Sequence, residues 1–193
     1  MEKIVITGGP GCGKSSVLVE LGRMGHLVLP EVFRWHKVLL TVESFGSVDG
    51  KSMRNRELIG SLLGFHRYFE DEDTADAFCF YDRCVLDLVA YIEFYSARRR
   101  SESTPDVLSF LDPYARRFAN NIHKAFLIPL PATGIVQDWL RTNTFEEAQL
   151  IEQRIRQTYS DYNVDLVYLP KKEVGCLCDL ILNHLNGKAG RDP

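Results

Sequence analysis

The chain has 193 residues, of which 45% are hydrophobic and 25% are charged, and its formal net charge is −3. These values are typical of a soluble globular protein with a sizeable core, and they exclude an intrinsically disordered chain. The slight negative charge argues against general binding of DNA or RNA. No apolar run approaches the roughly 20 residues of a membrane span, and the first predicted strand begins at residue 3, so we expect no signal peptide and a cytoplasmic location.

The first predicted strand, Lys3–Thr7, leads directly into a glycine-rich loop. This loop, Gly8–Ser15, reads GGPGCGKS and fits the pattern G-x-x-x-x-G-K-[ST] of a phosphate-binding loop, or P-loop. A helical segment from Ser16 to Leu21 follows, which completes the strand–loop–helix order that the motif requires. We therefore predict that the chain binds a nucleoside triphosphate.

The P-loop motif gives its residues distinct tasks. The glycines let the backbone curl so that several N–H groups point at one anion, and the following helix adds the positive end of its dipole. Lys14 is expected to contact the β- and γ-phosphates of ATP, and Ser15 to bind Mg²⁺ through its hydroxyl. The predicted nucleotide-binding residues are Gly8, Gly9, Pro10, Gly11, Cys12, Gly13, Lys14, Ser15 and Ser16.

Four further segments are short and almost continuously apolar, which is typical of parallel strands buried on both faces. They are Leu27–Leu29, Ala77–Tyr81, Ala125–Ile128 and Val164–Tyr168. Helical patterns fill the intervals between them, and this alternation predicts an α/β fold with helices on both faces of a five-stranded parallel sheet. We expect a single domain over residues 1–187 and a frayed tail over residues 188–193.

The interval between the second and third predicted strands is too long for a simple crossover. It is expected to contain helices over Val32–Ser44 and Met53–Phe69. Ligands of open α/β sheets bind beyond the carboxyl ends of the strands. We therefore expect this insertion, residues 31–73, to hold a phosphate acceptor.

Start and stop signals place the later helices. One helix is predicted over Arg83–Ala97, and another begins at Thr104, where Pro105 occupies the first helical position. Pro113 is expected to restart or kink this second helix because proline has no N–H to donate. The sequence TFEE from Thr144 predicts a capping box, and the last helix is predicted over Lys172–Leu185.

Charged side chains follow three of the predicted strands: Glu31 the second, Asp82 and Arg83 the third, and Arg141 the fourth. Phosphoryl transfer needs Mg²⁺, positive charge around the γ-phosphate, and a carboxylate that orients or deprotonates the acceptor. Glu31 and Asp82 suit the carboxylate roles, one in the water shell of Mg²⁺ and the other as base. Arg83 and Arg141 suit stabilisation of the transferring group, and Lys14 completes the set of predicted catalytic residues.

Each of these side chains also has a structural interpretation. Asp82 could cap the helix that follows it, and Glu31 could be an exposed acid in the first turn of a helix. Arg141 could belong to a surface loop. The P-loop at the same edge of the sheet favours the catalytic interpretation, most strongly for Asp82.

Four features stand in a fixed order along the chain. They are ITGGPGCGKS at Ile6–Ser15, LPEVFR at Leu29–Arg34, YDR at Tyr81–Arg83 followed by Asp87, Ala90 and Tyr91, and Asp138-x-x-Arg141 followed by TFEEA. This combination resembles the small AAA-labelled P-loop proteins related to the ribosylnicotinamide-kinase domain of the bacterial NAD-biosynthesis regulator. The resemblance extends from residue 3 to about residue 182.

The resemblance implies a kinase-like P-loop NTPase fold of three layers, with strand order 2-3-1-4-5 and a lid over residues 130–143. More distantly, the acid after the second strand and the Asp-Arg pair after the third are similar to those of deoxynucleoside and thymidylate kinases. In those enzymes the acid is the base and the arginine contacts phosphate or acceptor. The resemblance carries these roles to Glu31 and Arg83 as hypotheses.

Two functions compete at this point. The first is a kinase that transfers the γ-phosphate of ATP to a nucleoside-like or other metabolite hydroxyl. The second is a slow NTPase or binding module in which ATP or GTP switches a protein or lipid partner. Some members of the resembled family are GTP- or lipid-binding modules. The chain lacks the Asn-Lys-x-Asp motif of guanine specificity, so GTP is not indicated. Cys84 stands where members of that family tend to have glycine, and Glu43–Asp73 matches no known acceptor pocket.

Overall fold

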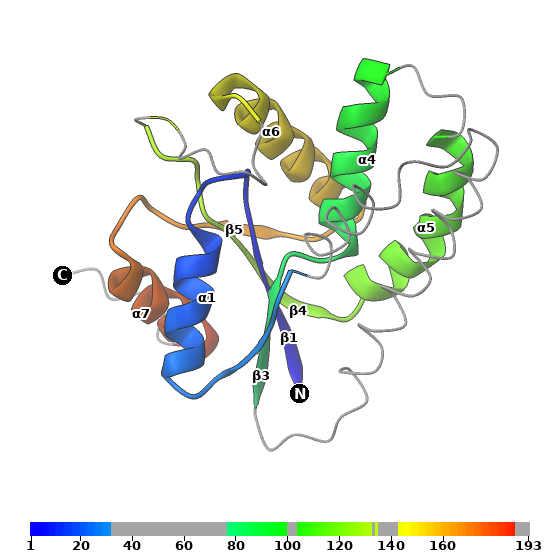
Figure 1. Ribbon diagram of the computed structural model, residues 1–193. Helices are drawn as coiled ribbons and strands as arrows, with labels where there is room; N and C mark the ends of the chain where they lie inside the picture. Colours follow the sequence, from blue (N-terminus) through cyan, green and yellow to red (C-terminus); the bar gives the residue numbers. More distant parts are fainter. Residues whose placement is uncertain (32–76, 100–103, 133, 135–142, 188–193) are drawn as a thin grey trace, which may run out of the picture.

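The computed structural model describes residues 1–31, 77–99, 104–132, 134 and 143–187. In this part of the chain, strands and helices alternate around one sheet (Figure 1). The elements are β1 (Glu2–Thr7), α1 (Lys14–Arg23), β2 (Leu27–Leu29), β3 (Phe78–Asp82), α4 (Val85–Arg99), α5 (Thr104–Ala119), β4 (Ile122–Leu127), α6 (Phe145–Asp161), β5 (Leu166–Tyr168) and α7 (Val174–Leu185).

The sheet has the order β2-β3-β1-β4-β5, and each neighbouring pair of strands is parallel. This confirms the α/β fold and the strand order that the resemblance implies. The five predicted strands all exist, although β4 begins at Ile122 rather than at Ala125. The first half of β4 carries the polar residues His123 and Lys124, so its apolar pattern begins only where the strand enters the core.

Two hydrophobic clusters cover the two faces of the sheet and give the fold three layers. In β1, Ile4 and Ile6 face the cluster formed with α1 and α7, and Val5 faces the cluster formed with α4, α5 and α6. All three side chains are fully buried. Figure 1 shows α1 and α7 on one side of the sheet and α4, α5 and α6 on the other. Burial on both faces explains why the central strand reads as a continuous apolar run.

The helices begin close to their predicted positions, with two differences. α4 begins at Val85 because Arg83 has a φ of 69°, a left-handed conformation that cannot belong to a right-handed helix. α5 does not restart at Pro113 but continues through it. Pro113 and Ser109, whose carbonyl would have accepted the missing N–H, are both exposed, so water can hydrate that carbonyl.

The capping box at the start of α6 is confirmed. The Oγ1 atom of Thr144 accepts a hydrogen bond from the backbone N–H of Glu147 at 3.2 Å, and the Glu147 carboxylate accepts from the N–H of Thr144 at 3.1 Å. These two bonds satisfy N–H groups at the N-terminus of α6 and fix the residue at which the helix begins.

Several predictions fall outside the described residues. They concern the helices over Val32–Ser44 and Met53–Phe69, the tail over residues 188–193, and Arg141. The expected lid over residues 130–143 is described only at residues 130–132, 134 and 143.

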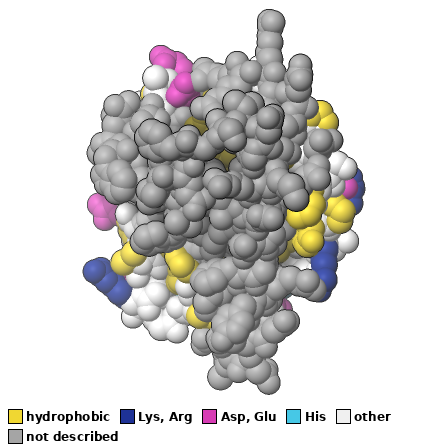
Figure 2. All heavy atoms as spheres, turned by 45° about the vertical axis from the view of Figure 1, so that its right-hand side comes forward, with side chains coloured by type: hydrophobic (Ala, Val, Ile, Leu, Met, Phe, Trp, Pro, Cys, Tyr) yellow, Lys and Arg dark blue, Asp and Glu magenta, His cyan; other side chains and the backbone are white. Residues whose placement is uncertain are grey.

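The described Lys and Arg side chains visible in Figure 2 lie apart, on opposite sides of the face shown there. In the described part of the chain, no helix has the length and apolar character needed to cross a bilayer.

Candidate functional site

The P-loop, Gly8–Ser15, connects the carboxyl end of β1 to α1 (Figure 1). Gly8, Gly11 and Gly13 have φ values of 144°, 89° and 93°, which side chains of L-residues rarely allow. Gly13 is also the N-cap of α1, and among the described residues no side chain caps this helix. The N-terminus of α1 is therefore left without a side-chain acceptor, as expected for a helix that receives an anion.

The start of the P-loop packs tightly against its surroundings. A Cβ atom on Gly8 would lie 2.3 Å from the carbonyl oxygen of Ile128, and one on Gly9 would lie 3.1 Å from the carbonyl oxygen of Ala148 and from the side chain of Leu130. The segment after β4 and the first turn of α6 thus support the loop from behind. Any side chain at Gly8 would push the loop away from this support.

The Lys14 side chain folds back over the P-loop. Its Nζ atom donates to the carbonyl oxygens of Gly8 at 3.0 Å and Gly9 at 3.1 Å, and it lies 3.4 Å from the Cys12 Sγ. Lys14 is buried, whereas the following Ser15 is exposed. The ammonium group therefore stands within the loop, and the Ser15 hydroxyl is accessible from outside it.

Asp82 is the last residue of β3 and pairs in register with Ile6, two residues before the P-loop. It is 9% exposed, and its Oδ1 atom is buried without a hydrogen-bond partner among the described residues. Burial raises the pKa of the Asp82 carboxyl to about 6; the nearby Glu31 carboxylate adds to this rise, and Lys14 and Arg83 oppose it. A buried carboxyl oxygen without a partner beside the P-loop is costly to the fold, and a carboxyl with a raised pKa is characteristic of functional sites.

Arg83 holds the next position and joins the ends of β1, β2 and β3. Its N–H donates to the carbonyl oxygen of Ile6 at 3.1 Å, and its Nε atom lies 3.1 Å from Oε1 of Glu31. Its guanidinium lies over the Tyr91 ring of α4, 4.8 Å from the ring centroid. Burial alone would lower the pKa of Arg83, but Glu31 and the neighbouring groups raise it well above its ordinary value, so the side chain stays charged.

The suggestion that Asp82 caps the following helix is wrong. Cys84 occupies the cap position of α4, since its carbonyl accepts the Leu88 N–H at 3.3 Å. The Cys84 N–H donates to Oδ2 of Asp87 at 2.9 Å, so Asp87 supplies the capping carboxylate. This frees Asp82 from any capping role. Asp87 had no predicted function, although an acid at the third position of a helix is itself a capping signal.

Among the described residues of this edge, Asp82 and Ser15 have the chemistry that a magnesium ion needs. Hard cations such as Mg²⁺ take oxygen ligands and usually keep several waters. The buried, unpartnered Oδ1 of Asp82 and the exposed hydroxyl of Ser15 are oxygen donors of that kind, and both adjoin the P-loop. The Glu31 carboxylate is already paired with Arg83.

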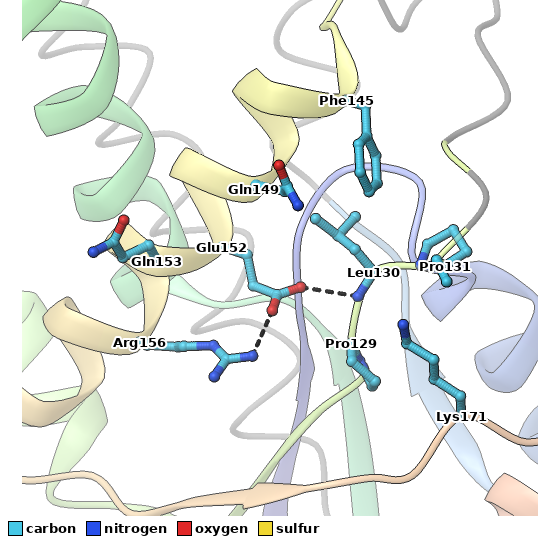
Figure 3. A pocket seen from close by; sticks show the side chains of 10 residues that line it. Pro129, Leu130, Pro131, Phe145, Gln149, Glu152, Gln153, Arg156 and Lys171 are labelled. Carbon is cyan, nitrogen blue, oxygen red and sulfur yellow. Dashed lines mark hydrogen bonds and ion pairs between the residues drawn. The ribbon is translucent and has the colours of Figure 1, made fainter.

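A hollow with a volume of about 490 Å³ lies beyond the ends of β4 and β5 (Figure 3). In Figure 3 the P-loop ribbon passes behind Leu130, and one face of α6 forms the opposite wall. The lining residues are Pro129, Leu130, Pro131, Ala132, Phe145, Gln149, Glu152, Gln153, Arg156 and Lys171. None of the predicted catalytic, nucleotide-binding or metal-binding residues lines this hollow, although residues 130–132 belong to the predicted lid.

Glu152 connects α6, which forms one wall of this hollow, to Leu130 in the segment after β4. Its carboxylate accepts the Leu130 N–H at 3.0 Å and an Arg156 N–H at 2.6 Å (Figure 3). Because Leu130 also contacts Gly9, α6 holds the segment after β4 against the P-loop through a buried charge-assisted hydrogen bond.

The structure brings four of the predicted site residues together. Lys14, Glu31, Asp82 and Arg83 come together at the carboxyl ends of β1, β2 and β3, as the sequence predicted. Ser15 and Ser16 are exposed at the start of α1. Arg141 lies outside the described residues.

This fold and this loop define a P-loop protein of the kinase-like class. A family model described as an AAA domain matches residues 3–175, and the chain belongs to that family. No curated protein sequence matches the chain significantly.

Solved structures of two kinases and of the NadR protein share the fold. Deoxyadenosine kinase from M. mycoides with bound dATP has a TM-score of 0.57 and 14% identity, over 95% of this chain and 99% of that chain. Thymidylate kinase from Candida albicans has a TM-score of 0.61 and 13% identity, over 97% and 92% of the two chains. The NadR protein in complex with NAD and AMP-PNP has a TM-score of 0.69 and 12% identity; it is matched over all of this chain, which spans 51% of the NadR chain.

Proposed function

We propose that this protein is a small-molecule kinase that transfers the γ-phosphate of ATP to the hydroxyl of a nucleoside-like or other metabolite acceptor. The observation that carries the proposal is the meeting of Glu31, Asp82 and Arg83 beside the P-loop. A P-loop that only binds MgATP needs one nearby carboxylate for the metal ion, a role that Asp82 fills. The second carboxylate, Glu31, and the buried Arg83 paired with it go beyond that need, and phosphoryl transfer uses both.

In this proposal the P-loop residues Gly8–Ser16 hold the triphosphate, and Lys14 contacts its β- and γ-phosphates. Lys14 would exchange its present carbonyl partners, Gly8 and Gly9, for phosphate oxygens. Mg²⁺, when bound, neutralises charge on the same phosphates. Ser15 and Asp82 would hold it, because Asp82 has the buried oxygen without a partner.

Glu31 is then the proposed base, and Arg83 the group that stabilises the transferring phosphoryl. Glu31 lies after β2, one strand farther from the P-loop than Asp82, on the side of the expected acceptor region, residues 31–73. It would accept the proton of the acceptor hydroxyl as the new P–O bond forms and the bond to ADP breaks. Arg141 is proposed to add positive charge from the lid, residues 130–143.

The kinase neighbours support the fold and the class of reaction, and the acceptor stays a proposal. Deoxyadenosine kinase and thymidylate kinase act on a nucleoside and a nucleotide, as their names state. We therefore propose nucleosides and nucleotides as the first acceptors to test, with vitamin-like metabolites beside them.

The test is an acceptor screen in which ADP formation is followed with MgATP and each candidate in turn. The proposal expects ADP formation that depends on one acceptor class. The Glu31→Gln variant should lose this activity, whereas its affinity for ATP should stay within about threefold of the wild-type value. Glu20→Gln is the matched control, because Glu20 pairs with Arg23 at 3.4 Å on the surface of α1. ATP binding without stimulation by any acceptor, and turnover equal in Glu31→Gln, would instead favour a nucleotide-dependent switch.

A further inference from the structure

The carboxylate of Asp87 lies at the junction of three elements that the proposed mechanism treats separately. It is 1% exposed and accepts hydrogen bonds from the Thr7 hydroxyl, from the Cys84 N–H at 2.9 Å and from the Tyr159 hydroxyl at 2.7 Å. Thr7 ends β1, Cys84 is the cap residue directly before α4, and Tyr159 belongs to α6. Thr7, Cys84 and Tyr159 are themselves buried, so water does not compete for these bonds.

The Tyr159 hydroxyl keeps the proton that it donates to Asp87. Burial raises the pKa of this hydroxyl, and the charge of Asp87 raises it further. Cys84 donates to Asp87 through its backbone N–H, and its thiol lies 3.2 Å from the Tyr159 hydroxyl. A buried carboxylate is stable only when hydrogen bonds replace its hydration, and here three donors do so.

Capping α4 explains only one of the three hydrogen bonds. The bond from Cys84 fixes the N-terminus of the helix, and any acid at this position would form it. The bond from Thr7 instead fixes the residue directly before Gly8, where the P-loop begins. The bond from Tyr159 fixes α6, whose residue Ala148 contacts the same loop at Gly9.

The Cys84 bond also fixes the turn that presents the charged residues. Arg83, which lies between Asp82 and Cys84, has a φ of 69°. A non-glycine residue in the left-handed region costs free energy, so its neighbours must hold it there. The Arg83 N–H bond to Ile6 holds one side of the turn and the Asp87 carboxylate holds the other.

We infer that Asp87 is a positioning residue that sets the P-loop and the Asp82–Arg83 turn in register with each other. Its two oxygens connect the last residue of β1 to the turn after β3 and to α6. The nucleotide half of the site and the charged half then move as one unit. This inference rests on the proposed function only in taking the P-loop as the nucleotide site.

The test measures the affinity for AMP-PNP with Mg²⁺ and the thermal midpoint in the same set of variants. Thr7→Val removes only the hydroxyl that reaches Asp87, and it should weaken binding at least about tenfold, the effect of one lost charge-assisted hydrogen bond. Thr7→Ser keeps the hydroxyl and should restore binding. Asp87→Asn should weaken binding at least as much as Thr7→Val.

Asp112→Asn is the matched control, because Asp112 accepts at 2.9 Å from the hydroxyl of Tyr162, the C-cap residue directly after α6. It removes a similar carboxylate–tyrosine bond away from the P-loop, and should lower the thermal midpoint while leaving affinity within about twofold. An AMP-PNP affinity of Thr7→Val equal to that of the wild type would overturn the inference. A loss of affinity in Asp112→Asn as large as that in Thr7→Val would overturn it too. Failure of the wild type to bind AMP-PNP would instead overturn the nucleotide site itself.

Discussion

Asp82 ionises at a cost in the folded protein, and the substitution Asp82→Asn removes that cost. The carboxyl is 9% exposed, and burial with Glu31 nearby raises its pKa from the ordinary value of 3.8 to about 6. At 1.36 kcal/mol per pKa unit, this rise corresponds to about 3 kcal/mol of lost stability once the group is charged in both states. Asparagine has nearly the same shape and cannot ionise.

The sign of the pH dependence follows from which state holds the proton. Between about pH 4 and pH 6 the folded protein keeps the Asp82 proton, whereas the unfolded chain has lost it. The contribution of Asp82 to stability therefore falls as the pH rises through this window. Asp82→Asn lacks this fall, so its stability relative to the wild type should increase by up to about 3 kcal/mol between pH 4 and pH 8.

Urea unfolding followed by far-ultraviolet circular dichroism measures this difference, with nucleotide-free protein at several pH values. Comparing the variant with the wild type cancels the groups that both proteins share. Asp112→Asn should show the opposite sign, because hydrogen bonding to Arg116 lowers the pKa of Asp112. A difference between Asp82→Asn and wild type that is flat or falls with pH would refute the reasoning.

The same substitution should abolish phosphoryl transfer, even though it stabilises the fold. Functional sites commonly retain groups that cost stability, and removing them stabilises the protein while activity is lost. The acceptor-dependent assay provides this measurement. Full turnover in Asp82→Asn would mean that Asp82 has no part in the reaction.

Three further predictions follow from single contacts. Gly8→Ala should abolish nucleotide binding because its Cβ would lie 2.3 Å from a backbone oxygen, whereas Gly13→Ala meets no atom within 4 Å and should cost only about 1 kcal/mol of strain in urea unfolding. Thr144→Ala should lower stability by about 1 kcal/mol through loss of the capping box, without changing ATP affinity. Glu152→Leu leaves the buried Leu130 N–H unpaired and should lower the free energy of unfolding in urea by about 2 kcal/mol. An unchanged free energy of unfolding would contradict the role of Glu152 in holding the segment after β4.

The motif predicted the conformation of the P-loop and its place between β1 and α1, because both follow from local backbone geometry. Glycine at Gly8 and Gly13 is required by positive φ, and the residues around them read as strand and helix without help from the rest of the chain. The position of Asp82 at the end of a strand was predictable in the same way. That Asp82 is buried with a raised pKa was not, because this depends on Glu31 and on packing from elements far away in the sequence.

The role of Asp87 could not be predicted for a related reason. Its helix-capping bond to Cys84 is local and has a sequence signal, but its partners Thr7 and Tyr159 stand 80 and 72 residues away in the chain. Nothing in the sequence marks which buried hydroxyls meet one carboxylate. The continuous α5 helix shows the same limit, since the effect of Pro113 depended on whether its turn faced water.

The sequence by itself determined the P-loop, the parallel strands and the charged residues at their ends, since periodicity and backbone preference are properties of short segments. The sheet then decided which ends meet: β1 between β3 and β4, with β2 beyond β3, brings Glu31 within 3.1 Å of Arg83 and sets Asp82 beside the P-loop. Burial, and the charge–charge interactions and hydrogen bonds between distant residues, arise only from that packing. For this reason the tertiary structure alone fixed the pKa of Asp82 and the junction at Asp87.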